Sequence, residues 1–348
     1  MNEQEAEQRL RALLQGMNSV NEIDVERQIM TADIGIDLIV SFRRNKTRHQ
    51  LIVEVKSNAE PARVRQSIWQ LQSAAEAYGK DARTLLAAPY ISPASQQICR
   101  ENGVGYLDFA GNAYLSVGGL DIDHRTDAKP KPEQRVLRSL FKPKAAAVLH
   151  VMLQDPSQKW RIGKLAQQAG VSAGHASQVG QQLRQREWAD QSSDGMWLSD
   201  PNALLDAWQE EYQAPPGEKV QLYTHLHGAG LQDAVRSVMV EETGGQLLYA
   251  SFSAADWIAP FARTGRSYFY ADERSLGQLQ VRLELQTASK GANIEILVPN
   301  DPDVFRTALP LENGIICTGS VQTYLDLSIA GERGKEAAEH LRAETLQW

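Results

Sequence analysis

Residues 34–56 read IGIDLIVSFRRNKTRHQLIVEVK. Two apolar runs, residues 34–42 and 50–56, flank a polar segment at residues 43–48. Isoleucine, leucine and valine favour strands, and a short polar segment between two such runs is typical of a hairpin turn. The stretch therefore predicts two neighbouring antiparallel strands.

Three ionisable residues mark these two strands. Side chains alternate between the faces of a strand, so Ile52, Glu54 and Lys56 share one face. The hairpin would lay the strand that carries Asp37 beside the strand that carries Glu54. Two carboxylates can bind a hard divalent cation, and a lysine can orient or activate a water molecule for attack on a phosphodiester. We therefore expect Asp37, Glu54 and Lys56 to meet at one end of the sheet.

The surrounding pattern extends this interpretation. Apolar residues at helical spacing predict a first helix before the hairpin, and further elements are expected after it. These are a helix at residues 61–78, a strand at 83–89, a helix at 93–102 and a last strand pair within 104–117. Asp37, followed by Glu54-Val55-Lys56 in this order of elements, resembles the PD-(D/E)XK nuclease-like superfamily over roughly residues 1–124.

The resemblance implies an α/β nuclease-like domain. If its site is active, the catalytic residues are Asp37, Glu54 and Lys56, and Asp37 and Glu54 bind Mg²⁺. Gln66 and Gln70, with Glu5 or Glu7, fall where the superfamily often has further polar residues. No proline precedes Asp37, which departs from the superfamily's pattern. The alternative is a half-buried strand edge with its charges in water.

Composition limits the classes of protein. The chain has 348 residues, 42% of them hydrophobic, and a net charge of −7. The longest nearly apolar runs span about nine residues, far fewer than the roughly 20 needed to cross a bilayer. Two distant cysteines exclude a disulfide framework and a cysteine-based zinc site. An acidic N-terminus differs from a secretory signal. We expect a cytoplasmic protein without a membrane segment.

Two breaks divide the chain. Residues 127–133 alternate lysine with proline, which favours an extended linker, and residues 213–218 contain adjacent prolines and a glycine. Three domains are expected, at residues 1–128, 133–212 and 217–348. The fold class is α+β multidomain: a PD-(D/E)XK-like α/β domain, a winged helix-turn-helix and a C-terminal mixed α+β domain.

The middle domain predicts DNA binding. Helices are expected at residues 144–154, 162–169 and 173–186, and a hairpin turns through residues 191–195, which is the pattern of a winged helix-turn-helix. Residues 135–188 contain nine basic side chains and two acidic ones, a net charge of +7. Such a local excess of positive charge suits binding to phosphates.

Ten residues are candidates for contacts with double-stranded DNA. Basic side chains can bind phosphates, and short polar side chains at the start of a recognition helix can contact bases in the major groove. Ser172 can alternatively act only as an N-cap. Val179 and Leu183 should face inward. The candidates are Lys159, Arg161, Lys164, Ser172, His175, Ser177, Gln178, Gln181, Arg184 and Arg186.

The third domain mixes expected strands at residues 247–250, 267–271 and 294–298 with helices at 231–240, 321–328 and 335–345. Its segments 291–299, 321–327 and 331–338, with residues 105–112 and the winged helix, resemble the AbiEi family of type IV toxin–antitoxin antitoxins and transcriptional regulators. The resemblance implies a DNA-binding autorepressor that counteracts a nucleotidyltransferase-like toxin encoded nearby. Short family members begin with the winged helix, whereas about 130 residues precede it here.

Three functional hypotheses follow. The first is a transcriptional regulator, which needs no cofactor. The second is a Mg²⁺-dependent DNA endonuclease that uses Asp37, Glu54 and Lys56 while the winged helix delivers DNA. In the third, the first domain is a structural module for oligomerisation. A palindromic operator would indicate a homodimer.

Overall fold

The structure is a computed structural model that describes residues 3–17, 20–31, 34–78, 82–126, 137, 139–240, 245–261, 264–287 and 290–348. The predicted linker at residues 127–133 lies outside these residues, as do Arg135 and Arg138. The chain forms two compact units, residues 1–137 with 181–187 and residues 138–180 with 188–348. No helix within the described residues is long and apolar enough to span a membrane.

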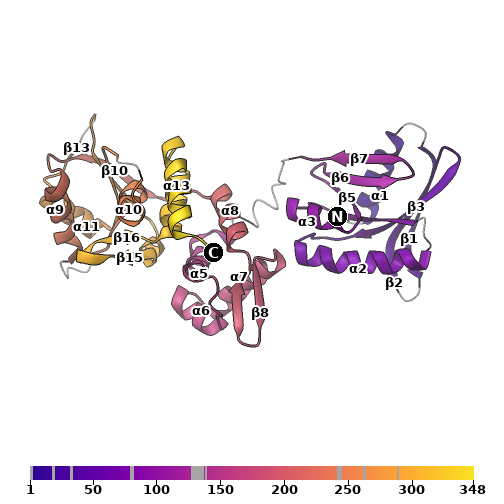
Figure 1. Ribbon diagram of the computed structural model, residues 1–348, viewed down its shortest axis with the longest axis horizontal. Coiled ribbons are helices and arrows are strands. Elements are labelled where there is room, and N and C mark those ends of the chain that lie inside the picture. Colours follow the sequence, from indigo (N-terminus) through magenta and orange to yellow (C-terminus); the bar gives the residue numbers. More distant parts are fainter. Residues whose placement is uncertain are drawn as a thin grey trace. The chain divides into compact units, whose positions relative to one another are not determined.

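The first unit contains a seven-stranded sheet whose strands follow one another in chain order (Figure 1). The central strands β3, β4 and β5 are parallel, and antiparallel pairs flank them on both sides. The predicted hairpin is confirmed as β2 and β3. The strands are β1 (Val20–Thr31), β2 (Ile34–Arg44), β3 (Thr47–Val55), β4 (Ala82–Ala88), β5 (Gly105–Asp108), β6 (Ala113–Val117) and β7 (Leu120–His124).

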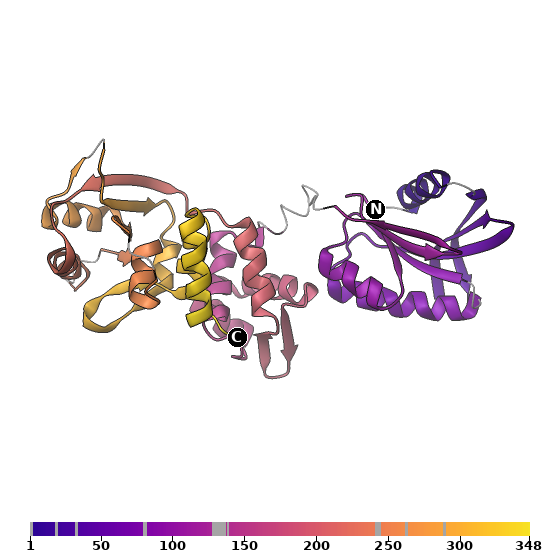
Figure 2. The same ribbon diagram turned by 45° about the horizontal axis from the view of Figure 1, so that its top comes forward.

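Helices cover both faces of this sheet. Helix α1 (Glu3–Gln15) packs Leu10 and Leu14 against Val53 on one face. Helices α2 (Pro61–Tyr78) and α3 (Pro93–Glu101) pack on the other face, where Ile68 joins Ile52 in a second core. Figure 2 shows the sheet between α1 and α2. The two cores explain why β3 reads as a continuous apolar run, because its side chains are buried on both faces.

Strand β1 is not among the predicted elements. Its register shifts between Asn21 and Asp24, and Glu22 and Gln28 have positive φ angles of 50°. Such a bulge breaks the two-residue alternation by which a strand is recognised in sequence. Strand β7 is also an addition to the predicted order.

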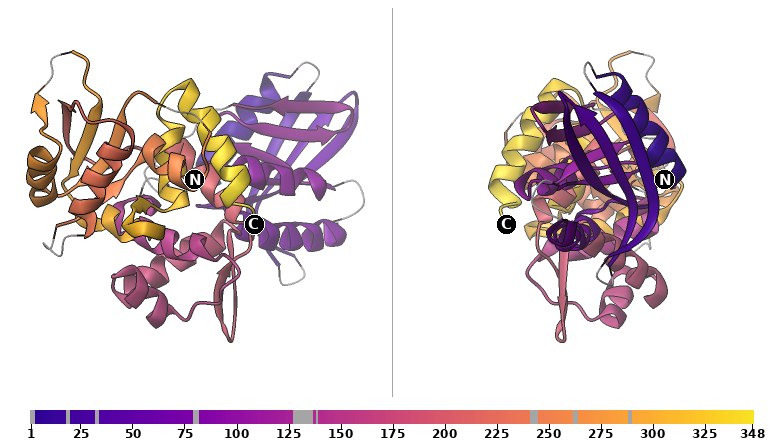
Figure 3. Two further views of the ribbon diagram at one scale, coloured as in Figure 1. Left: turned by 60° about the vertical axis from the view of Figure 1, so that its left-hand side comes forward. Right: turned by 90° about the vertical axis from the view of Figure 1, so that its right-hand side faces the viewer.

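Three helices and a hairpin follow in the chain, and all of them belong to the second unit except residues 181–187, which include the end of α7. They are α5 (Pro143–Gln154), α6 (Ile162–Ala169), α7 (Ala173–Gln185), β8 (Ala189–Ser192) and β9 (Gly195–Leu198). The hairpin projects from the helices in Figure 3. Trp160 forms an additional antiparallel bridge to Met196 of β9. The order and bounds agree closely with the predicted helices and hairpin.

A second seven-stranded sheet follows in the order β13-β10-β14-β12-β11-β16-β15. Leu247 and Tyr249 pack with Val235 and Leu279 in the larger core, and Leu248 packs on the other face. The strands are β10 (Gly217–Tyr223), β11 (Leu247–Tyr249), β12 (Ser267–Ala271), β13 (Gln286–Thr287), β14 (Ile294–Pro299), β15 (Ala308–Pro310) and β16 (Ile316–Thr318).

Helices around this sheet complete the second unit. They are α8 (Pro201–Glu211), α9 (Gly228–Val240), α10 (Ser251–Ile258), α11 (Glu273–Arg282), α12 (Ser320–Ser328) and α13 (Glu332–Thr345), with the short 3₁₀ helices η1 (Pro302–Thr307) and η2 (Glu312–Gly314). Arg342 of α13 donates to Asn202 of α8 at 2.8 Å, and Tyr324 of α12 donates to Gln209 at 2.8 Å. Helix α8 is therefore fixed to the two C-terminal helices.

Candidate carboxylate site and nucleic-acid interface

The carboxylates of Asp37 and Glu54 lie on paired strands. Leu38 of β2 stands opposite Val53 of β3, so the next step of the register brings Asp37 opposite Glu54. Asp37 Oδ2 accepts a hydrogen bond from the backbone N–H of Val55 at 2.6 Å. Lys56 forms an ion pair with Glu54 through Oε1. The structure thus brings the three predicted residues to one end of the sheet.

Burial raises the pKa values of both carboxylates. Desolvation is the main cause of the raised pKa of Asp37, and Glu3 at the start of α1 raises it further. The pKa of Glu54 is also raised, first by desolvation and then by the negative charge of Asp37, while Lys56 acts in the opposite direction. Two adjacent carboxylates with raised pKa values favour a bound proton or cation.

Two carboxylates, those of Asp37 and Glu54, are available as metal ligands at this site. No cluster of three or more histidine, cysteine, aspartate or glutamate side chains with metal-binding geometry occurs in the described part of the chain. Glu7 is used elsewhere, since its carboxylate pairs with Arg11 at 2.8 Å and with Arg27 at 2.6 Å. Mg²⁺ commonly binds through one or two carboxylates, with water and phosphate oxygens completing its coordination. Asp37 and Glu54 fit a cation held in that manner.

Helix α7 presents a polar face to solvent. Ser177, Gln178, Gln181 and Arg184 are exposed, and His175 is half-buried. The opposite face is apolar, with Val179 and Leu183 at 2% and 0% exposure, as predicted. Ser172 Oγ accepts a hydrogen bond from the backbone N–H of His175 at 3.2 Å. Ser172 therefore stabilises the first turn of α7 as an N-cap and is itself exposed.

Most of the basic candidates are exposed, and one is not. Arg161 precedes α6 and Lys164 lies on its exposed face. Lys159 lies 3.7 Å from Asp194 and stands over the ring of Trp197, near the hairpin tip. Arg186 is 7% exposed, and its guanidinium donates to the carbonyl of Gln182 at 3.3 Å. In this conformation Arg186 is less accessible to a phosphate than the other basic candidates.

Glycines shape the helix pair and the hairpin. Gly170 ends α6 in the left-handed region, with φ of 67°, and its N–H bonds back to the helix. A side chain at Gly180 would come within 2.7 Å of Met196 Sδ, so glycine there lets α7 approach β9. The sequence does not predict this contact, because it joins two elements that are separated in the chain.

A buried polar network in the second unit carries no sequence motif. Asp326 of α12 is 7% exposed, and its Oδ1 accepts hydrogen bonds from Tyr212 at 2.5 Å, Tyr270 at 2.9 Å and Gln322 at 2.9 Å. Burial raises the pKa of Asp326 to about 6. His150 of α5 bonds to Gln322, and burial lowers the pKa of His150 to about 4. Helix α12 reads SVQTYLDLS, so its aspartate stands among other polar residues and does not mark a site in the sequence.

Comparison with solved structures returns three partial likenesses. One is the crystal structure of a repair endonuclease from Pyrococcus abyssi, at 19% identity, covering 26% of this chain and 39% of that one, with a TM-score of 0.22. EndoMS in its apo form is 18% identical, with 30% and 45% covered and a TM-score of 0.22. An EndoMS–dsDNA complex is 20% identical, with 31% and 46% covered and a TM-score of 0.21. The chain spans less than half the length of each.

Comparison with protein families gives a match in the second unit. No curated protein matches this chain. The family described as "Transcriptional regulator, AbiEi antitoxin, Type IV TA system" matches residues 197–347, which run from β9 to the end of α13. The match does not extend to residues 105–112. Over residues 197–347 the chain therefore matches the AbiEi_2 family of antitoxins, the transcriptional regulators of type IV toxin–antitoxin systems.

Proposed function

We propose that the protein is a DNA-binding transcriptional regulator, the antitoxin and autorepressor of a type IV toxin–antitoxin system. In this proposal α5, α6, α7, β8 and β9 form a winged helix-turn-helix, with α7 as the recognition helix and β8–β9 as the wing. The family match over residues 197–347 supports the regulatory part of the proposal.

The exposed face of α7 is the observation that carries DNA binding. Its first two turns present short polar and amide side chains, and glutamine can pair bidentately with adenine in the major groove. Lys164 and Arg184 flank this face with positive charge that no acidic partner neutralises among the described residues. The pattern suits base contacts from the centre of the helix and phosphate contacts from its surroundings.

Removing the flanking charges should weaken binding to every sequence. The double variant Lys164→Ala/Arg184→Ala is expected to lose about tenfold or more in affinity at low salt, and the slope of log K against log salt should fall by roughly 1.8, about 0.9 for each lost phosphate contact. The measurement is fluorescence anisotropy of the full chain with DNA from upstream of its own gene and with shuffled DNA. Gln178→Ala should instead reduce the preference for the upstream sequence.

The matched control is Lys335→Ala, which removes one positive charge from α13, where Lys335 pairs with Glu332 at 2.9 Å. It should leave both affinity and salt slope unchanged. If the double variant behaves like this control, α6 and α7 do not form the DNA interface.

The partner proposed for the antitoxin is a nucleotidyltransferase-like toxin encoded nearby, and a homodimer is proposed as the DNA-binding form. Two copies of α7 related by a twofold axis would read two half-sites about one turn of DNA apart. Footprinting of the upstream DNA tests this arrangement, because a dimer protects a palindrome and a monomer protects one half-site.

A second candidate function is a metal-dependent DNA endonuclease, favoured by the juxtaposition of Asp37, Glu54 and Lys56. Asp37 and Glu54 would hold Mg²⁺, which would supply charge stabilisation at a phosphodiester. Lys56, paired with Glu54, is placed to orient a water molecule or to hold a proton near it.

Asp37→Asn should test this site directly, because it removes one anionic ligand and keeps the shape of the side chain. We expect the affinity for Mn²⁺, measured by calorimetry as a substitute for Mg²⁺, to fall at least tenfold, and any magnesium-dependent cleavage of DNA to be lost. Glu101→Gln, at an exposed position of α3, is the matched control. Cleavage that survives in Asp37→Asn would remove this site from consideration.

A further inference from the structure

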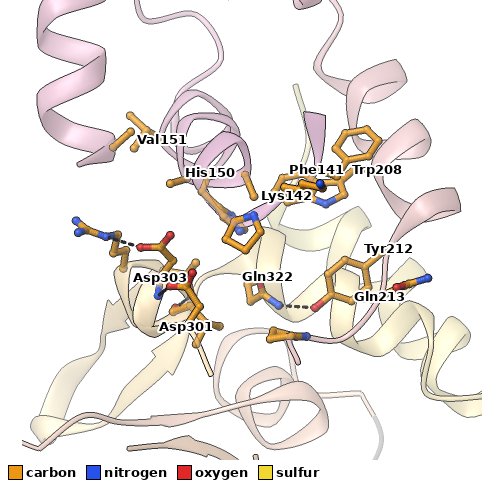
Figure 4. Close-up of a pocket in the computed structure, with 18 of the residues that line it drawn as sticks. Phe141, Lys142, His150, Val151, Trp208, Tyr212, Gln213, Asp301, Asp303 and Gln322 are labelled. Atoms are coloured by element: carbon orange, nitrogen blue, oxygen red, sulfur yellow. Dashed lines mark hydrogen bonds and ion pairs between the residues drawn. The ribbon is translucent and has the colours of Figure 1, made fainter. Parts of the chain in front are cut away.

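A cavity of about 450 Å³ lies within the second unit, lined by residues of α5, α6, α8, η1 and α12. Pockets that bind small molecules typically measure about 300 to 1,000 Å³ and combine an apolar lining with a few polar groups. Figure 4 shows residues from these separate segments converging on one space. The size and the composition of the lining are those of a ligand site.

One side of the cavity is a row of aromatic rings. Phe141 stacks on Trp208 with ring centroids 5.7 Å apart and an interplanar angle of 6°. His150 contacts the same indole, with centroids 4.8 Å apart. Phe141 and Trp208 are thus nearly parallel, whereas the His150 ring is tilted by 56° to the indole. A side built from aromatic rings favours an aromatic occupant, because stacked and tilted ring pairs both contribute free energy beyond the burial of their area. Small apolar side chains complete the wall, among them Ala146, Ala147, Val151 and Val304.

Hydrogen bonds fix the position of three polar side chains that line the cavity, Gln322, Tyr212 and His150. Gln322 is 4% exposed and donates to Tyr212 at 2.7 Å, and His150 bonds to Gln322. The imidazole of His150 is neutral at pH 7, because its pKa is about 4. A neutral imidazole has one donor and one acceptor nitrogen. Gln322 bonds to one nitrogen, and the other nitrogen can form a hydrogen bond with a ligand.

The charges at the rim are largely compensated. Arg306 pairs with Asp303 at 3.2 Å, and Asp301 accepts a hydrogen bond from the backbone N–H of Asp303 at 3.0 Å. Lys142 and Glu211 add one charge of each sign to the lining. The lining therefore carries two positive and three negative side chains, a net charge of −1, so an anionic ligand gains little there.

We propose that this cavity binds an uncharged planar aromatic or heteroaromatic molecule, which lies along the row Phe141, Trp208 and His150 and hydrogen-bonds to His150. The site is separate from the surface of α7 and from the pair Asp37 and Glu54. Its test therefore succeeds or fails independently of the proposed regulatory function.

Three naphthalene probes test the class of ligand with the full chain. 2-Naphthol is planar, uncharged at pH 7 and carries one hydroxyl; 2-methylnaphthalene lacks the hydroxyl, and naphthalene-2-sulfonate adds a charge. We expect saturable binding of 2-naphthol by fluorescence titration, weaker binding of 2-methylnaphthalene and the weakest binding of the sulfonate. The absence of saturable 2-naphthol binding overturns the proposal, as does a sulfonate that binds as tightly as 2-naphthol.

Two variants locate the binding. Ala146→Trp fills the cavity and should weaken 2-naphthol binding at least tenfold. His150→Phe keeps a ring but removes the acceptor nitrogen, so 2-naphthol should bind roughly tenfold more weakly, as expected for one lost hydrogen bond, while 2-methylnaphthalene is unchanged. Val281→Trp, at a position 77% exposed on α11, is the matched control and should bind as the parent does. Equal binding by all three variants overturns the proposal.

Hydrogen exchange of the unaltered protein gives a readout that needs no variant. Saturating 2-naphthol should slow exchange in peptides that cover α5 and α8 and leave those of α9 and α11 unchanged. Protection confined to α9 and α11 would place the probe elsewhere and overturn the assignment.

Discussion

Replacing Asp108 by alanine should destabilise the first unit by about 3 to 5 kcal/mol, because it leaves several buried donors without an acceptor. Asp108 ends β5 and is 0% exposed. Its Oδ1 accepts from the backbone N–H of Gly111 at 3.0 Å and of Asn112 at 2.9 Å. Its Oδ2 accepts from the backbone N–H of Ile91 at 3.0 Å and from the Asn112 side chain at 2.8 Å.

The loss of stability in Asp108→Ala should extend beyond the β5–β6 turn. Asn112 Oδ1 accepts from the backbone N–H of Thr126 at 2.8 Å, so one carboxylate orders the segment before α3, the β5–β6 turn and the chain after β7. Hydrogen exchange of the full chain should show faster exchange in peptides covering residues 105–126. Asp121→Ala, at an exposed position of β7, should change stability by less than about 0.5 kcal/mol. An Asp108→Ala protein that exchanges like this control would contradict the prediction.

Asp326 and His150 should impose opposite pH dependences on the second unit. The folded-state pKa of Asp326 is raised to about 6, so its contribution to stability is present below pH 4 and is lost as the pH rises to 6. The pKa of His150 is lowered to about 4, so its contribution is present above pH 6.5 and is lost as the pH falls to 4. For each group, the difference between the folded-state pKa and the ordinary pKa corresponds to about 3 kcal/mol.

Single substitutions should separate the two contributions. In the parent protein these two contributions largely cancel between pH 4 and 6. Asp326→Asn should leave a stability that rises by about 3 kcal/mol from pH 4 to 6.5, and His150→Phe should leave one that falls by a similar amount from pH 4 to 6. Urea unfolding at half-unit pH steps measures both slopes. Two variants with the slope of the parent protein would show that neither group titrates as described.

The sequence predicts the elements whose pattern is local. The β2–β3 hairpin has two apolar runs around a polar turn, and the α6–α7 pair is marked by a glycine and a helix cap. Both are present at nearly the expected residues. Strand β1 is absent from the prediction because its bulge interrupts the alternation. Strand β10 is also absent from the prediction, because its sequence, GEKVQLY, has few apolar residues and most of its side chains are exposed.

The candidate sites also differ in whether the sequence predicts them. Asp37, Glu54 and Lys56 can be placed together from sequence because they lie on one hairpin, whose register follows from its turn. The burial of Arg186 cannot be read from sequence, since Arg184, two residues earlier, is exposed. The cavity and the Asp326 network are built from α5, α8, η1 and α12, segments that only the tertiary fold brings together.

The strand orders of the two sheets differ, and this difference governs how each sheet can form during synthesis. In the first sheet every strand pairs with the next one along the chain, so pairing can advance as the chain emerges from the ribosome. In the second sheet β11 lies between β12 and β16, the last strand to be made. That sheet cannot close until Ile316–Thr318 has been synthesised, and its earlier strands remain open to wrong pairing for longer.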